Sequence, residues 1–171
     1  GRYPVDDAAQ AAFVRYSEFV ARYFKGRVYD LEVWNEWNQH GNPRDYARLL
    51  SKVYPALKRI DPQIRVIGGA VEGAGRPDFI ATLAREGALS SMDLLSVHPY
   101  VFWRGDSGTP QALVRWLDDL QAVLMPYRNS RPMPLLLTDI GWPSAGKRGI
   151  PPARAADYAS LFTVENQALL F

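Results

Sequence analysis

Two carboxylic acids in this sequence each stand where an apolar, strand-like segment ends. Glu36 follows the segment 29–33 and lies among an amide and two indoles. Asp139 follows the apolar segment 135–137 and also precedes a tryptophan. Aromatic faces stack on sugar rings, and glycosidic bonds are hydrolysed by pairs of carboxyl groups. The pattern therefore predicts paired acid chemistry on a glycoside, with both carboxylates at one end of a common sheet.

The elements that must position these residues alternate along the chain. Apolar residues at helical spacing predict helices over about 7–25, 43–60, 77–87, 110–127 and 152–169. Short apolar runs bounded by turn residues predict strands over about 28–34, 64–70, 94–97 and 134–138. Strands that alternate with helices indicate right-handed βαβ units and a parallel sheet.

Polar, aromatic and glycine residues gather just after each predicted strand, which is typical of the working face of a (β/α)8 barrel. A doubly wound fold would instead be expected to carry a glycine-rich phosphate loop, and the sequence has none. A whole barrel needs eight strands and about 250 residues. We therefore expect one α/β domain over 1–171 that is a partial TIM barrel. Either further protein or a second copy of the chain would complete it.

Composition excludes several other classes of protein. The 171 residues are 47% hydrophobic and 12% aromatic, enough for a packed core. A net charge of +2 with scattered basic residues argues against nucleic acid as a partner. The absence of cysteine removes disulfides, thiol nucleophiles and Cys-based zinc sites. His40 lacks a ligand pattern around it, so no metal is predicted, and no apolar run is long enough to span a membrane.

Three motifs carry a resemblance to a known group of enzymes. They are Val33-Trp34-Asn35-Glu36-Trp37-Asn38, Ser96-Val97-His98-Pro99-Tyr100 and Thr138-Asp139-Ile140-Gly141-Trp142-Pro143-Ser144. In this order they resemble the ends of the fourth, sixth and seventh barrel strands of clan A retaining glycoside hydrolases. The β-xylosidase-like family 39 and its bacterial exopolysaccharide-hydrolase relatives are the most similar. The resemblance implies cleavage of β-linked oligo- or polysaccharides without a cofactor. It favours a secreted or periplasmic location but leaves the compartment open.

By this resemblance Glu36 is the general acid/base and Asn35 binds the sugar 2-hydroxyl. Asp139 occupies the position of the nucleophile, but the family pattern there is Thr-Glu-Ile-Gly-Trp. The missing methylene withdraws the carboxylate by roughly 1.5 Å. The retaining separation of about 5–5.5 Å would then widen toward about 6.5–7 Å. Asp139 is thus an impaired nucleophile, a nucleophile compensated by a backbone shift, or a residue that only caps the next loop.

His98 and Tyr100 are two residues apart, which places both side chains on one face of an extended segment. The resemblance implies that the Tyr100 hydroxyl holds the nucleophile and that His98 lines the sugar pocket. A phenol that donates a hydrogen bond to a carboxylate favours the ionised form that a nucleophile requires. The alternative is a structural histidine satisfied within the core.

Three tryptophans at strand ends are candidates for stacking on pyranose rings: Trp37, Trp103 and Trp142. Each could equally pack into the core, whereas Trp116, at helical spacing, is expected to be a core residue. Two functions of other classes remain open. A carbohydrate-binding pseudoenzyme would bind glycans without cleaving them, and a structural α/β interaction module would bind none.

Overall fold

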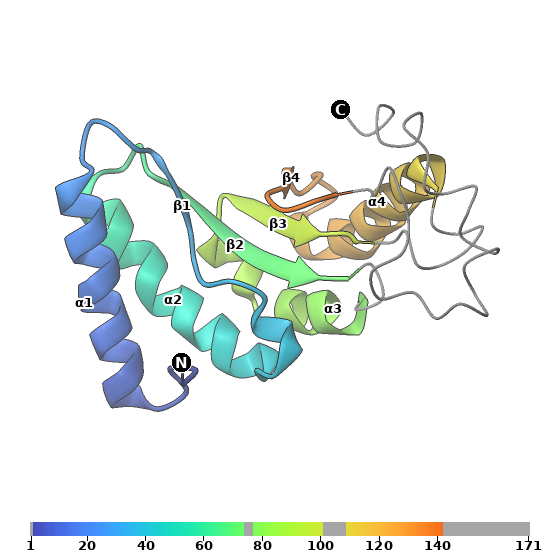
Figure 1. The fold of residues 1–171 in the computed structure, drawn as a ribbon. Helices are drawn as coiled ribbons and strands as arrows, with labels where there is room; N and C mark the ends of the chain where they lie inside the picture. The colour runs from blue at the N-terminus through green and yellow to red at the C-terminus, as the bar shows by residue number, and fades with distance from the viewer. Residues whose placement is uncertain (1, 74–76, 101–108, 142–171) are drawn as a thin grey trace, which may run out of the picture.

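The computed structural model describes residues 2–73, 77–100 and 109–141 (Figure 1). Trp103, Trp142 and the helix predicted over 152–169 lie outside these described residues.

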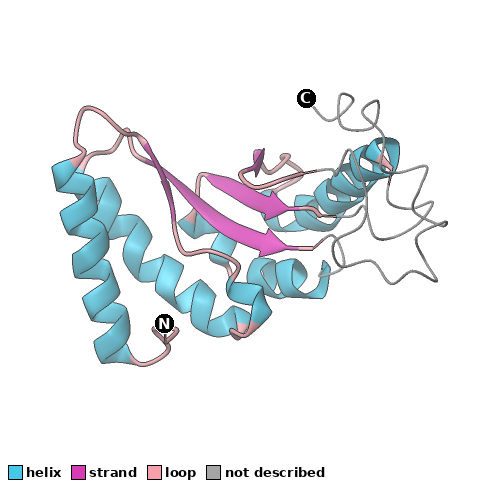
Figure 2. Ribbon diagram, in the orientation of Figure 1, coloured by secondary structure: helices cyan, strands magenta, loops and turns pink. Residues whose placement is uncertain are grey.

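Within these described ranges, four parallel strands form one sheet in the order β1-β2-β3-β4. Their bounds are β1 Asp30–Glu32, β2 Arg65–Glu72, β3 Leu94–His98 and β4 Leu135–Leu137. The α-helices are α1 Asp7–Tyr23, α2 Pro43–Ile60, α3 Pro77–Arg85 and α4 Pro110–Leu124. Short 3-10 helices are η1 Trp37–Gln39, η2 Ala88–Ser91 and η4 Met125–Arg128. Helices and strands alternate along the chain (Figure 2), so the predicted four-stranded part of a (β/α) barrel is confirmed.

Helix α2 forms the centre of the core, as its apolar stripe predicts. The Asn42 side chain accepts the Arg44 amide at 2.8 Å, and Pro43 occupies the first turn, where it costs no hydrogen bond. Fully buried side chains along the helix include Tyr46, Leu49, Leu50 and Val53. Because burying one large apolar side chain contributes about 1.5–3 kcal/mol, this helix anchors the sheet beside it.

Helix α1 begins as predicted and has one side buried. The Asp6 carboxylate accepts the Ala9 amide at 2.7 Å and caps the helix. Among its aromatic residues, Phe13 is half-buried against the core, whereas Tyr16 and Tyr23 are each 61% exposed. Buried Gln10 faces α2 and donates to the Asp45 carbonyl at 3.2 Å. The buried side of α1 thus carries Gln10, Phe13 and Ala21.

A bulge in β2 shapes the edge at which the strands end. The register shifts between Gly68 and Val71. Gly69 has φ +107°, and a β-carbon there would overlap the carbonyl oxygen of Ser96 in β3. Only glycine combines this conformation with so close an approach. The bulge leaves the Ala70 carbonyl free to accept the Glu36 amide at 3.0 Å, which ties the segment after β1 to β2.

Candidate active site

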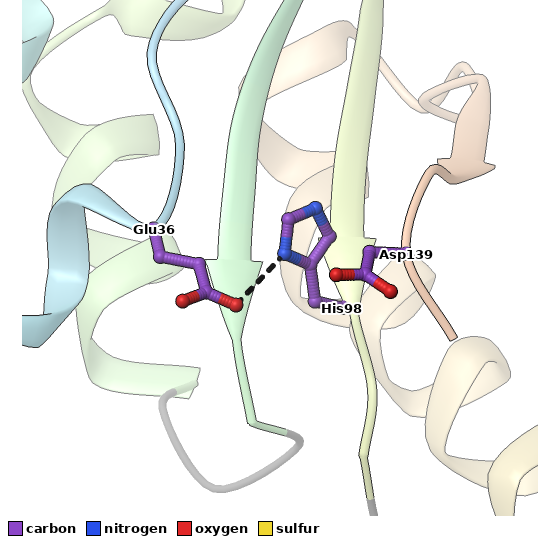
Figure 3. Close-up of side chains that lie close together, drawn as sticks. All are labelled: Glu36, His98 and Asp139. Atoms are coloured by element: carbon purple, nitrogen blue, oxygen red, sulfur yellow. Dashed lines mark hydrogen bonds and ion pairs between the residues drawn. The ribbon is translucent and has the colours of Figure 1, made fainter. Parts of the chain in front are cut away.

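Glu36, His98 and Asp139 meet at the carboxyl end of the sheet (Figure 3). Glu36 follows β1, His98 ends β3 and Asp139 follows β4. One oxygen of each carboxylate and one ring nitrogen of His98 all lie within 4.8 Å of one another. The structure therefore brings the two predicted carboxylates together at one edge, with the predicted histidine between them.

The backbone at Glu36 adopts a conformation that few non-glycine residues accept. Trp34 has φ 71° and Glu36 has φ 47°, both in the left-handed region. Such conformations persist where the surroundings hold them, and here the next residue, Trp37, is fully buried. Its indole nitrogen donates to the Asn42 carbonyl at 2.9 Å, and Gly41 passes so close to the ring that a β-carbon would overlap it. The core thus fixes the position of Glu36.

The burial of Trp37 corrects one prediction from the sequence. Trp37 was a candidate for stacking on sugar, but it has no exposed surface. Its ring packs edge-on against Tyr3 and Trp34 and at a tilt against Tyr46. Trp37 therefore supports the site from within the core and has no exposed ring face for a ligand.

Both carboxylate oxygens of Glu36 have a partner. Oε1 lies 3.1 Å from Nδ1 of His98, and Oε2 accepts Nε2 of Gln39 at 2.5 Å. The side chain of Glu36 is 18% exposed, whereas that of His98 is 1% exposed. His98 is therefore enclosed and satisfied, while Glu36 remains open to a ligand from one side.

Asp139 is held less firmly. It is exposed and follows a three-residue strand whose members are all half-buried. Its partner is the hydroxyl of Tyr100, which donates to Oδ1. The hydrogen bond to this carboxylate, with some desolvation and the negative charge nearby, raises the pKa of Tyr100 to about 12. The phenol thus keeps its proton through the neutral range and holds Asp139 in place.

Three further residues were predicted to bind the sugar: Asn35, Trp103 and Trp142. Asn35 is exposed beside Glu36 at the same edge. Trp103 and Trp142 lie outside the described residues, so their predicted roles remain predictions.

Several site residues were not predicted from the sequence. Buried Asn38 ties the segment after β1 to β2: its amide nitrogen donates to the Glu72 carbonyl at 2.8 Å, and its oxygen accepts the Glu72 amide at 2.9 Å. Thr138 contacts His98, and its hydroxyl donates to Glu32. The available signal was a polar residue within a predicted strand end for Thr138, and none that distinguishes Asn38 from other loop amides.

The donor set formed by Glu36, His98 and Asp139 is one that a divalent cation could use. In the structure each of these side chains has a hydrogen-bond partner in the protein. In the described part of the chain, no helix has both the length and the apolar character needed to cross a bilayer.

Comparisons with known proteins extend these observations. No protein-family model matches the sequence, and no curated protein matches it. Solved structures do match. A family 39 glycoside hydrolase from the gut symbiont Bacteroides cellulosilyticus WH2 is 24% identical over 98% of this chain and 36% of its own, with a TM-score of 0.72. A glucosidase from Croceicoccus marinus is 19% identical over 83% of this chain and 32% of its own, with a TM-score of 0.64.

A monomeric beta-xylosidase from Caulobacter crescentus CB15 is 24% identical over 78% of this chain and 31% of its own, with a TM-score of 0.54. This chain thus spans about a third of the length of these three structures. The predicted resemblance to family 39 glycoside hydrolases is confirmed at the level of the fold. The chain has the fold of part of the TIM barrel of these enzymes.

Proposed function

We propose that residues 1–171 are a catalytic-domain segment of a glycoside hydrolase that cleaves β-linked oligo- or polysaccharides. The observation that carries this proposal is the approach of Glu36 and Asp139, whose nearest oxygens lie within 4.8 Å at the carboxyl edge of the sheet. Retaining glycosidases hold their carboxyl groups about 5–5.5 Å apart, and inverting ones about 6.5–9.5 Å apart. Facing carboxylates at one sheet edge suit either two-carboxylate mechanism, and the similarity to family 39 enzymes favours the retaining one.

In this mechanism Glu36 protonates the leaving oxygen and later activates water, while Asp139 attacks the anomeric carbon. The enclosed contact with His98 and the amide of Gln39 orient the Glu36 carboxyl. Tyr100 aims the Asp139 carboxylate. Asn35 binds the 2-hydroxyl, and Trp103 and Trp142 supply stacking faces. The rest of the barrel, from further protein or from a second copy of the chain, closes the substrate site.

The proposal is tested by hydrolysis of aryl β-xylosides, aryl β-glucosides and the matching oligosaccharides. These sugars are the first choice because similar structures are named as a beta-xylosidase and a glucosidase. The assay compares this chain alone with the natural protein that contains it. Proton NMR of the first anomer released distinguishes retention from inversion.

Glu36→Gln is expected to lower kcat on oligosaccharides by about 10²–10⁴-fold, because an amide cannot donate the proton. Activated aryl glycosides, whose departure needs little acid assistance, should lose much less. Glu86→Gln is the matched control, since the Glu86 carboxylate pairs with exposed Arg44, outside the candidate site. Equal losses in the two variants would contradict the assignment of Glu36.

Asp139→Glu restores the length of the family nucleophile. Since displacement by about 1 Å can cost about a hundredfold in rate, the variant is expected to raise activity by up to that factor. Lower activity in the variant together with inverted product from the wild type would make Asp139 a base that activates water. Binding of glycans without cleavage by either form would instead support a carbohydrate-binding pseudoenzyme, and no binding at all a structural module.

A further inference from the structure

A chain of hydrogen bonds leads from Glu32 in β1 to Glu36 by way of two other strands. The Thr138 hydroxyl lies 2.9 Å from Glu32 Oε1 and 3.0 Å from Nε2 of His98. Nδ1 of His98 then faces Glu36 Oε1 at 3.1 Å. Glu32 Oε1 also accepts the hydroxyl of Ser96. A carboxylate outside the proposed catalytic pair is thus linked to it through Thr138 and His98.

The donor and acceptor types assign a direction to each of these bonds. An ionised carboxylate only accepts, so the single proton of the Thr138 hydroxyl is used on Glu32. The Thr138 oxygen can then only accept from His98, which assigns a proton to Nε2 of the imidazole. The direction of the Ser96 hydroxyl is fixed as well, because it donates its proton to Glu32 and accepts a hydrogen bond from the Ala70 amide at 2.7 Å.

The proton on Nε2 determines which group donates the hydrogen bond between His98 and Glu36. If the imidazole is neutral, Nδ1 carries a lone pair and can only accept a hydrogen bond. Its contact with Glu36 Oε1 then requires a proton on the Glu36 carboxyl. With an imidazolium, Nδ1 donates to the Glu36 carboxylate. In both forms the proton at this contact can pass to Glu36 and on to a leaving group, because the imidazole keeps its own proton on Nε2.

The opposite tautomer would have a different effect. If Thr138 turned its proton toward Nε2, the imidazole proton would move to Nδ1 and donate to the Glu36 carboxylate. That proton would belong to a neutral imidazole, which could release it only by becoming an imidazolate, so the pair would hold no usable acid proton. Glu32 opposes this tautomer because it uses the Thr138 proton. His98, at 1% exposed, has little access to water as a substitute partner.

We propose that Glu32 is a positioning residue that fixes the His98 tautomer through Thr138 and so keeps a proton on the His98–Glu36 pair. The use of that proton in catalysis rests on the proposed function, whereas the tautomer does not. A merely structural Glu32 would tie β1 to β4 without affecting the imidazole.

Nitrogen-15 NMR of the histidine rings tests the proposal on the whole 171-residue chain. The sequence has only two histidines, so His40→Gln assigns the signals of His98. We expect the wild type to carry a proton on Nε2, either in the neutral Nε2–H ring or in the imidazolium. In Glu32→Ala this proton should be lost in favour of a neutral Nδ1–H ring, because the Thr138 proton is released. A neutral Nδ1–H ring in the wild type would by itself overturn the proposal.

Thr138→Val tests the same link from its other end, since it removes the hydroxyl and keeps Glu32. It should also weaken the Nε2–H preference, and Thr138→Ser should restore it. Asp30→Ala is the matched control: Asp30 lies two residues before Glu32 on the same strand face and pairs with Arg65 at 2.5 Å. A wild-type tautomer in both Glu32→Ala and Thr138→Val would overturn the proposal.

Kinetics separate this proposal from the proposed function. Glu32→Ala should lower kcat on oligosaccharides by at least about tenfold, part of the 10²–10⁴-fold that an acid contributes, with KM and activated aryl substrates little changed. A shifted tautomer in a protein without glycosidase activity would support the positioning network and contradict the proposed function. Loss of activity in Glu36→Gln with an unmoved tautomer in Glu32→Ala would do the reverse.

Discussion

The two carboxylates of the candidate site are held by unlike parts of the molecule. Glu36 is joined to the core through fully buried Trp37 and through the β2 bulge, and both its oxygens have partners. Asp139 is exposed after a short, half-buried strand, and its position depends on the Tyr100 hydroxyl. The difference indicates that the proposed acid is positioned by packing of the described residues, whereas the proposed nucleophile is positioned by one hydrogen bond at the sheet edge.

The largest expected effect on stability comes from Trp37→Ala, which removes the core contact that holds Glu36. Removing a fully buried indole should lower the free energy of unfolding by about 3–5 kcal/mol, a large share of the 5–15 kcal/mol typical of a domain. Trp116→Ala makes the same chemical change at a half-buried position and should cost clearly less. Urea unfolding measures both, and equal costs would contradict the anchoring role of Trp37.

Trp37 also illustrates what the sequence could and could not predict. Within the described residues, the alternation of helices and strands and the apolar face of α2 followed from local periodicity, and the structure confirms them. A tryptophan at a strand end could line a pocket or pack, and its neighbours in space decide between the two. Here Tyr3, far away in the sequence, covers its ring.

The site itself was predictable where one strand end carries one functional side chain. Glu36, His98 and Asp139 follow from strand ends of a parallel sheet meeting at one edge. Glu32 and Thr138 did not follow, because their importance lies in a contact between β1 and the end of β4. Such a contact depends on the curvature of the sheet, which brings together strands that are not hydrogen-bonded neighbours.

The second expected effect comes from Gly69→Ala, which would also act on the Glu36 side. A β-carbon at Gly69 would overlap the Ser96 carbonyl, and its φ of +107° is unfavourable for alanine. We expect a cost above about 2 kcal/mol and displacement of the neighbouring Ala70 carbonyl that binds the Glu36 amide. Gly26→Ala, with positive φ but open space around it, should cost only about 1–2 kcal/mol. Similar values in urea unfolding would show that the bulge is not tightly constrained.

A smaller effect on stability is expected from Tyr100→Phe on the Asp139 side. Loss of one partly exposed hydrogen bond should cost no more than about 1.5 kcal/mol. If the proposed function holds, kcat should nevertheless fall, because nothing else among the described contacts of Asp139 aims its carboxylate. Tyr127→Phe, at a residue 46% exposed, is the control. A large loss of stability with unchanged kcat would contradict the expectation that the Tyr100 hydroxyl matters for positioning Asp139 and little for stability.

The smallest effect is a pH dependence that distinguishes the two sides. The pKa of Tyr100 is raised to about 12 by its bond to Asp139, and burial raises the pKa of Tyr46, whose hydroxyl donates to the Val33 carbonyl beside the Glu36 segment. Because the native state holds these protons more tightly than the unfolded chain, stability is fully present below about pH 10 and falls as the pH rises further.

Burial holds the proton of Tyr46 more strongly than the bond to Asp139 holds the proton of Tyr100. As the pH rises, the contact between Tyr100 and Asp139 should therefore be lost first. Titration of tyrosinate absorbance should show one ionisation near pH 12 that is absent from Tyr100→Phe. In unfolding experiments across about pH 10–12, this variant should lose less stability than the wild type. Identical titrations would mean that the Tyr100 hydroxyl is not committed to Asp139, and the contrast between the two carboxylates would then lose its main support.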